Sequence, residues 1–412
     1  MTNKKIKYQC TDCNKTYQED ELQYLCPDCN AKASPDQPPL GVLKVIYDYE
    51  VLKEKSFQSL EESQFLDLLP IQSMESLPYL KVGNTPLYKV DELNEEKLDF
   101  NLFLKDDSQN PTYSFKDRAS AVVSAYAKEK GFETIVTAST GNAGSSLAGI
   151  CAAQKQKAII MVPEAAPIAK LSQILMYGAQ IVPVKGTYDD AFDLSVKATE
   201  EFGWYNRNTA YNPLTIEGKK TVAFELFEQM NQQIPDRIFV PVGDGVIISG
   251  VFKGFEDLLK LNIIQKMPII VAVQSEKSNN LIRNIDNEVF DIEESHTLAD
   301  SISVDIPRNY FMAKNFLKKY CGESISISDE AILGASSMLS KNTGLFAEPA
   351  AAAAFAGLLA YQQQNKLKAH SKNVVLLTGS GLKDLKAVKN NIHMPLSIYP
   401  EVNELKRLLR IE

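Results

Sequence analysis

Three segments of this 412-residue chain repeat the order apolar strand, loop and helix, and this repetition constrains the fold most. Such units align their strands in parallel and cover the sheet with helices. Further strand-like runs alternate with helical runs later in the chain, so the sequence predicts an α/β fold with mostly parallel, twisted sheets in two lobes. The strand-like runs are residues 100–105, 134–138, 158–162, 180–184, 237–240 and 269–274.

The first loop carries Lys116 at the entrance of the helical run 119–130. The N-terminal N–H groups and the macrodipole of a helix disfavour a protonated ammonium there, and partial burial disfavours it further. A lysine amine that is neutral can form a Schiff base with an aldehyde cofactor. We therefore predict that Lys116 is the catalytic residue; the alternative is a solvated surface charge.

The second and third loops each precede a helix and contain glycine, which is typical of anion sites built from backbone N–H groups. Taken singly, each is equally consistent with an ordinary turn. The second loop reads Ser139-Thr140-Gly141-Asn142, and the third reads Gly243-Asp244-Gly245-Val246-Ile247.

The order of these motifs resembles the fold-type II pyridoxal-phosphate enzymes, which are similar to the tryptophan synthase β chain. The resemblance covers residues 77–386 and is greatest to the threonine synthase family, because of the stretches at 114–118, 217–221 and 379–384. The matching motifs are Gly83-Asn84-Thr85-Pro86-Leu87, Asn110-Pro111 with Ser114-Phe115-Lys116-Asp117-Arg118, Ser139 to Asn142, Glu348-Pro349 and Thr378-Gly379-Ser380-Gly381.

The resemblance implies a role for each position. Lys116 would form the Schiff base with pyridoxal 5'-phosphate and later shuttle a proton, and Asn142 would donate to the phenolic oxygen of the cofactor. The backbone of Ser139, Thr140, Gly141 and Asn142 would bind the substrate α-carboxylate. Gly243, Asp244, Gly245, Val246 and Ile247 would bind the cofactor phosphate, and Thr378 would meet the pyridine nitrogen with a hydroxyl. Residues 36–130 and 231–412 would form the large cofactor lobe, and residues 131–230 a small mobile lobe.

The implied function is that of a lyase acting on an amino acid with a leaving group at the β or γ carbon. The leading case is threonine biosynthesis, in which O-phosphohomoserine and water give threonine and phosphate. Threonine or serine dehydration and β-replacement, as in cysteate synthesis, stay open, as does a catalytically silent zinc-ribbon binding protein.

Two departures bear on the substrate. Thr215 stands where threonine synthases usually carry a phosphate-gripping arginine, and the loop 243–250 resembles that of the dehydratases. Asp244 would repel a phosphate, so its side chain should point away from it. Four bases could replace the arginine: Arg207, Lys219, Lys220 and Arg308.

Four cysteines near the N-terminus form two Cys-x-x-Cys pairs separated by twelve residues, Cys10 with Cys13 and Cys26 with Cys29. Four thiolates at this spacing close a tetrahedral zinc site, and a site without an open position is structural. We expect a zinc ribbon over residues 1–35; the alternative is two disulfides or a redox pair.

Composition excludes other classes of protein. A net charge of −8 and a pI near 5.3 argue against a nucleic-acid partner. The apolar run 349–361 is too short to span a bilayer, and residues 1–5 are too few for a signal peptide, so we expect a cytoplasmic enzyme with a small-molecule substrate and no membrane partner. Residues 402–411 predict an amphipathic helix that packs on the body or on a second subunit, which leaves a homodimer open.

Overall fold

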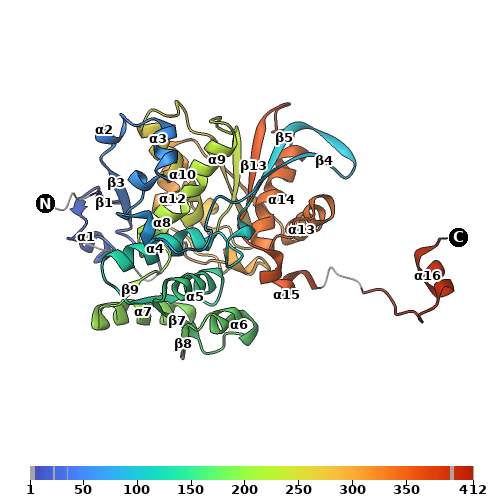
Figure 1. The fold of residues 1–412 in the computed structure, drawn as a ribbon, viewed down its shortest axis with the longest axis horizontal. Helices are drawn as coiled ribbons and strands as arrows, with labels where there is room; N and C mark the ends of the chain where they lie inside the picture. Colours follow the sequence, from blue (N-terminus) through green and yellow to red (C-terminus); the bar gives the residue numbers. More distant parts are fainter. Residues whose placement is uncertain (1–4, 22–23, 35, 390–393, 412) are drawn as a thin grey trace.

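The structure is a computed structural model, and it describes residues 5–21, 24–34, 36–389 and 394–411. Its described elements form a six-stranded sheet, a four-stranded sheet and a small three-stranded sheet near the N-terminus (Figure 1). The two larger sheets are mostly parallel and are flanked by helices, which confirms the predicted α/β class.

The six-stranded sheet has the order β12-β11-β10-β13-β5-β4. All neighbouring pairs are parallel except β4 with β5, so β4 is an antiparallel edge strand. Its central strands are almost continuous runs of buried apolar residues, as is typical of a sheet covered on both faces. The strands are β4 (Leu87–Leu93), β5 (Glu96–Asp106), β10 (Arg237–Pro241), β11 (Ile269–Ser275), β12 (Glu323–Ile327) and β13 (Lys372–Leu377).

Helices on the six-stranded sheet include α14 (Pro349–Gln363), which packs against β10 and β13. Its Ala-rich first turns, residues 350–354, are almost completely buried, because small side chains let the helix approach the sheet closely. The helix α10 (Val246–Lys260) contacts β10 and β11 and packs on α8 (Leu214–Lys219), α9 (Thr221–Gln229) and α12 (Tyr310–Lys319). α13 (Asp329–Thr343) packs beside α14.

The four-stranded sheet has the order β8-β7-β6-β9, and all of its neighbouring pairs are parallel. Helices α5 (Asn142–Gln154) and α7 (Tyr188–Phe202) pack against its strands, while α6 (Ile168–Met176) packs on α5, and α4 (Lys116–Glu129) packs on α5 and α8. The strands are β6 (Thr134–Ala138), β7 (Lys157–Pro163), β8 (Gln180–Val184) and β9 (Tyr205–Asn206).

The small sheet joins the cysteine module to the body. β1 (Ile6–Cys10) pairs antiparallel with β2 (Thr16–Gln18) and with β3 (Leu43–Tyr47), and α1 (Pro27–Asn30) lies beside them. The Tyr24 ring stacks on Tyr211 at 4.5 Å between ring centroids, and its hydroxyl accepts a hydrogen bond from the Asn206 N–H at 2.9 Å. The boundaries of the ribbon and of the two lobes remain predictions.

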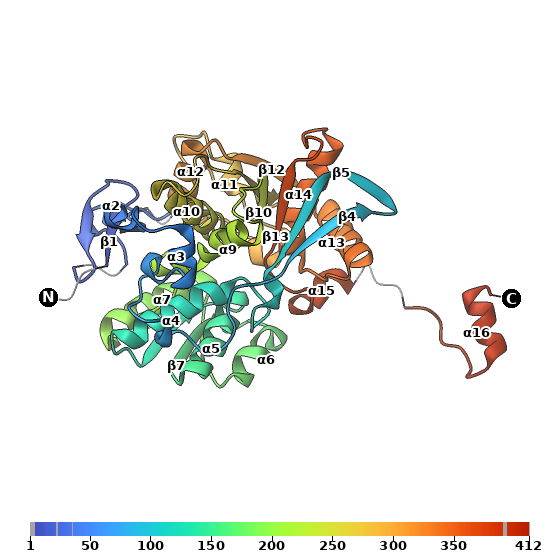
Figure 2. The same cartoon turned by 45° about the horizontal axis from the view of Figure 1, so that its top comes forward.

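The C-terminal helix α16 (Val402–Leu409) lies away from the body in both views (Figures 1 and 2). None of its residues is buried, and Leu405 and Leu408 are exposed along it. Packing on the body is therefore not observed, and packing on a second subunit remains a prediction. No helix among the described residues is long and apolar enough to cross a membrane.

Candidate active site

Lys116 is the first residue of α4 and is held beside the end of β13. The Phe115 N–H donates to the Thr378 carbonyl at 2.9 Å, and Ser114 forms an antiparallel bridge with Gly379. The predicted helix entrance and the loop after β13 are therefore adjacent, although more than 260 residues separate them.

The Lys116 amine is half-buried and makes no hydrogen bond or ion pair with any described residue. Burial lowers the pKa of the amine, and the positive charge of Arg207 acts in the same direction. The carboxylates of Glu348 and Asp244 oppose this shift. The amine is thus biased towards the neutral, nucleophilic form that a Schiff base requires.

The loop Ser139 to Asn142 joins the end of β6 to the start of α5. Ser139 and Gly141 are half-buried, and the Gly141 N–H donates to the Ser139 hydroxyl at 3.2 Å. A Cβ atom at Gly144 would lie 2.4 Å from the Ser139 carbonyl oxygen, so the tight turn requires glycine there. Backbone N–H groups at this helix start can bind a carboxylate.

Asn142, at the start of α5, faces Glu348, which directly precedes α14. Its side-chain amide donates to both carboxylate oxygens at 3.0 Å and to the Ser301 hydroxyl at 3.4 Å. Glu348 is buried directly before α14 but makes no capping hydrogen bond to that helix. Burial raises the pKa of Glu348, while the positive charge of Lys116 opposes the shift. The structure thus places Glu348 beside Asn142.

The third loop, Gly243 to Ile247, ends where α10 begins. Gly245 has a φ of +82°, a left-handed conformation that favours glycine, and no described residue accepts a hydrogen bond from the N–H groups of residues 243–247. The Asp244 carboxylate accepts the Arg308 N–H at 3.1 Å, so this side chain is turned towards residues 307–309. N–H groups without an acceptor at a helix start can bind an anion, so the predicted phosphate site stays a prediction that this loop allows.

Thr378 follows β13 directly and is buried. Its carbonyl accepts the Phe115 N–H, whereas its hydroxyl makes no hydrogen bond with any described residue. A neutral hydroxyl is therefore available beside the Lys116 helix; its role as the partner of a pyridine nitrogen stays a prediction.

The four bases that could replace the missing arginine differ in their partners. Lys220 is fully buried in ion pairs with Glu217 and Asp257 at 2.5 and 2.7 Å. Arg308 pairs with Asp189 and stacks on the Phe192 ring.

The other two bases, Arg207 and Lys219, are buried and form no ion pair with a described carboxylate. Burial lowers the pKa of Lys219, and the nearby charges of Arg207 and Lys116 lower it further. Thr215 is buried, and its hydroxyl donates a hydrogen bond to the Asn212 carbonyl at 2.8 Å.

Lys383 is a further residue of this region that was not singled out from the sequence. Its amine donates to the Ser145 hydroxyl at 2.8 Å and also to the Gln173 side chain, so it links the loop after β13 to α5 and α6. Burial lowers the pKa of Lys383 to about 8. Its only sequence signal was its place in the 379–384 stretch.

The four N-terminal cysteines converge as predicted, with all of their sulfur atoms within 4.8 Å of one another. Cys10 and Cys29 are 3.7 Å apart at their sulfurs, and Cys13 and Cys26 are 3.8 Å apart. Disulfide sulfurs would be separated by about 2.05 Å. Four thiolates at about 2.3 Å from a tetrahedral zinc ion would be about 3.8 Å apart, so the cluster fits zinc.

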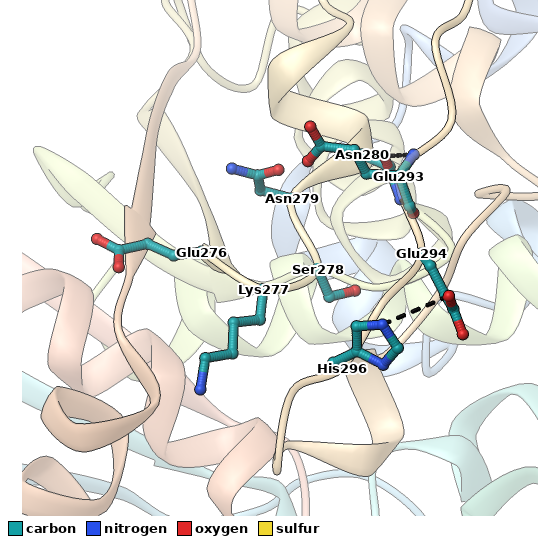
Figure 3. Close-up of a pocket in the computed structure, with 8 residues that line it drawn as sticks. All are labelled: Glu276, Lys277, Ser278, Asn279, Asn280, Glu293, Glu294 and His296. Atoms are coloured by element: carbon teal, nitrogen blue, oxygen red, sulfur yellow. Dashed lines mark hydrogen bonds and ion pairs between the residues drawn. The ribbon is translucent and has the colours of Figure 1, made fainter.

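A separate surface pocket of about 410 Å³ opens after β11 (Figure 3). In its wall the His296 Nε2 atom lies 3.5 Å from a Glu294 carboxylate oxygen, and both side chains are largely exposed. None of the residues predicted from the sequence lines it, so it is distinct from the site around Lys116. The lining residues are Glu276, Lys277, Ser278, Asn279, Asn280, Glu293, Glu294 and His296.

Comparison with known proteins agrees with this geometry. Residues 79–379 match the family described as pyridoxal-phosphate dependent enzyme. The chain is 34% identical to a threonine synthase of Methanocaldococcus jannaschii over 411 residues, which cover 97% of this chain and 98% of that protein. It is 36% identical to a threonine synthase of Bacillus sp. (strain ULM1) over 76% of this chain and 87% of the relative.

Solved structures show the same fold. A threonine deaminase from Solanum lycopersicum matches with a TM-score of 0.66 at 22% identity, covering 81% of this chain and 92% of that one. A serine racemase from maize matches with a TM-score of 0.65 at 23% identity, covering 82% and 96%. At these identities the likeness concerns the fold alone.

Proposed function

Because the chain belongs to the pyridoxal-phosphate-dependent enzyme family, and its relatives are threonine synthases, we propose that it converts O-phosphohomoserine and water to threonine and phosphate. One observation supports this proposal above the others. The Lys116 amine is half-buried, unpaired and biased towards its neutral form, and it lies among loops that carry free N–H groups and a free hydroxyl.

The residues around Lys116 fit pyridoxal 5'-phosphate. The N–H groups of Gly243 to Ile247 would hold its phosphate, and the Thr378 hydroxyl would meet its ring nitrogen without fixing a positive charge there. Asn142 would donate to its phenolic oxygen, and Lys116 would bind its aldehyde. When bound, the cofactor supplies an electron sink that stabilises negative charge at the substrate α carbon.

The protein's own residues then bind the substrate and move its protons. In the Ser139 to Asn142 loop, the N–H groups of Thr140 and Asn142 have no acceptor among the described residues; they would hold the α-carboxylate and so orient the α carbon towards Lys116. The Lys116 amine would take the proton from that carbon and return a proton later in the reaction. The Asn142 amide holds the Glu348 carboxylate, whose charge acts on the Lys116 amine.

We propose a structural role for zinc in the cysteine module, since four thiolates leave no position open for a substrate. Tyr24 and β3 tie the module to the body, so the metal would stabilise that interface. A cytoplasmic location and assembly as a homodimer remain predictions.

Threonine or serine dehydration is the second candidate, because Thr215 leaves the expected arginine position without charge and the 243–250 loop resembles that of dehydratases. One assay distinguishes the synthase from the dehydratase. The holoenzyme is given O-phosphohomoserine, threonine or serine, and phosphate and ammonia release are followed side by side.

Phosphate and threonine formed from O-phosphohomoserine support the synthase. Ammonia from threonine or serine, without phosphate release, supports a dehydratase. A β-replacement enzyme would instead release phosphate from O-phosphoserine only when a nucleophile such as sulfite is added. Protein that stays colourless after cofactor addition would favour the catalytically silent alternative.

A further inference from the structure

Arg207 is fully buried, yet neutral groups supply its only described partners. Its Nε donates to the Ser120 hydroxyl and its Nη1 to the Thr209 hydroxyl, both at 3.2 Å. Its Nη2 is buried without any hydrogen-bond partner. A buried guanidinium that lacks an anion is costly, so packing alone does not account for this residue.

Arg118 shows how the same fold treats a buried arginine with a structural role. Its Nε pairs with Asp107 at 2.6 Å and its Nη1 with Glu225 at 2.5 Å. No described carboxylate forms an ion pair with Arg207, although the charge of Asp117 opposes the effect of burial on its pKa. Burial accordingly lowers the pKa of Arg207 to about 10. The charge of Arg207 is therefore available to an anionic ligand.

The position of Arg207 places this charge beside the reacting centre. Its N–H donates to the Val136 carbonyl of β6 at 2.8 Å, and β6 leads into the loop that begins at Ser139. Its side-chain partner Ser120 lies four residues after Lys116 on α4, so the two share a helix face. Arg207 thus contacts both the Lys116 helix and strand β6 of the four-stranded sheet.

Arg207 also lies next to the segment that lacks the expected arginine. The Asn212 side chain donates to the Asn206 carbonyl at 2.7 Å, and the Asn212 carbonyl accepts the Thr215 hydroxyl. Asn212 therefore links Thr215 to the residue that precedes Arg207. The Arg207 guanidinium thus belongs to the same segment as the position at which the resemblance to threonine synthases leads us to expect an arginine.

Lys219, the other unpaired base, packs against a different helix. Its Cβ would be 2.7 Å from a Cβ added at Gly250, so it packs against α10, whose N-terminus forms the proposed cofactor-phosphate site. Lys219 thus lies against the helix that begins at the proposed cofactor-phosphate site. The charge of Arg207 therefore remains available to a second anion, distinct from the cofactor phosphate.

We propose that Arg207 binds the phosphate group of the substrate and holds it as it leaves from the γ carbon. This inference rests on the proposed function, which supplies a phosphorylated amino acid. When the bond between the γ carbon and oxygen breaks, its electron pair leaves with the phosphate. The unpaired Nη2 of Arg207 can donate to that developing charge, a charge-assisted hydrogen bond that Thr215 cannot make.

The test uses the cofactor-saturated enzyme and the variant Arg207→Gln, which keeps a polar side chain of moderate size and removes the charge. We expect kcat/KM for O-phosphohomoserine to fall by about ten- to a hundredfold, and inhibition by inorganic phosphate to weaken similarly. The visible absorbance of the bound cofactor should not change. The variant Arg207→Lys keeps a positive charge but lacks the planar guanidinium with its several N–H donors. It should therefore recover part of the lost kcat/KM.

Arg237→Gln is the matched control. Arg237 begins β10 at the end opposite to the proposed cofactor-phosphate site, and it pairs with Glu323. Its replacement should leave kcat/KM and phosphate inhibition within about twofold. A kcat/KM in Arg207→Gln that also stays within about twofold, with wild-type enzyme active on O-phosphohomoserine, overturns the proposal while the proposed function stands.

Two further outcomes are separable. If Arg207→Gln does not fold, the variant Ser120→Ala replaces it in the test, because it removes the hydroxyl that orients Nε. The kcat/KM of this variant should fall several-fold, and an unchanged value overturns the proposal.

If the wild-type enzyme is inactive on O-phosphohomoserine, the proposed function fails. Inorganic phosphate should then still raise the melting temperature of wild-type holoenzyme but not that of Arg207→Gln, and an equal response in both overturns the anion site.

Discussion

Lys220 provides a sharp test of which bases serve the site, because the structure assigns it to the core and not to the substrate. It is fully buried and pairs with Glu217 at 2.5 Å and with Asp257 at 2.7 Å. Lys253 adds a second cation, 2.5 Å from Asp257. Tyr47 of the N-terminal sheet donates to Glu217 at 2.5 Å, so this network also anchors the cysteine module.

The variant Lys220→Met removes one of two cations that face two carboxylates. The methionine fills similar space, but the site retains a net negative charge away from water. Breaking a buried ion pair in this way costs about 3–5 kcal/mol. We therefore expect the free energy of unfolding to fall by about that amount, while KM for O-phosphohomoserine of the folded enzyme stays within about twofold.

Urea unfolding followed by circular dichroism measures the first quantity, and steady-state kinetics the second. Lys53→Met is the control, since Lys53 forms a solvent-exposed pair with Glu50 that contributes only about 0–1 kcal/mol. A loss below about 1 kcal/mol in Lys220→Met, or a tenfold rise in KM at unchanged stability, would refute the assignment of Lys220 to the core.

Two other perturbations test the metal and the amine. Replacing Cys13 and Cys29 with serine should release one zinc ion, measured by elemental analysis, while the cofactor still binds; full zinc retention would contradict the four-thiolate site. The lowered pKa of Lys116 means that its neutral form becomes more populated as the pH rises towards that pKa, so cofactor uptake by the apoprotein should accelerate with pH. Stopped-flow absorbance measures this rate, and a rate independent of pH between about pH 6 and 9 would exclude a protonated resting amine.

The sequence predicted the local units of the fold well. The strand expected at 134–138 is β6, Thr134–Ala138, and the strand expected at 180–184 is β8, Gln180–Val184. Both are short apolar runs bounded by glycine or polar residues. Their length and composition are typical of the buried parallel strands that form there. The edge strand β4 was not predicted, because its alternation is weak and its residues are mostly exposed.

Contacts between distant segments were less accessible to sequence reasoning. Lys116, Asn142 and Thr378 could each be placed at a loop, because a strand end and a helix start mark such positions. The link between Asn142 and Glu348 spans 206 residues, and no local pattern encodes it. Whether a buried base such as Arg207 is paired likewise depends on the packing of several elements.

Reductive trapping of the cofactor tests the central claim most directly. Borohydride fixes the cofactor to the amine that binds its aldehyde, and mass spectrometry of the digested protein then identifies the modified lysine. We expect Lys116 to carry the cofactor, and Lys116→Ala to lose both the visible absorbance and the turnover while remaining folded. Modification of Lys219 or Lys383 in the wild-type enzyme, or normal turnover by Lys116→Ala, would contradict the account.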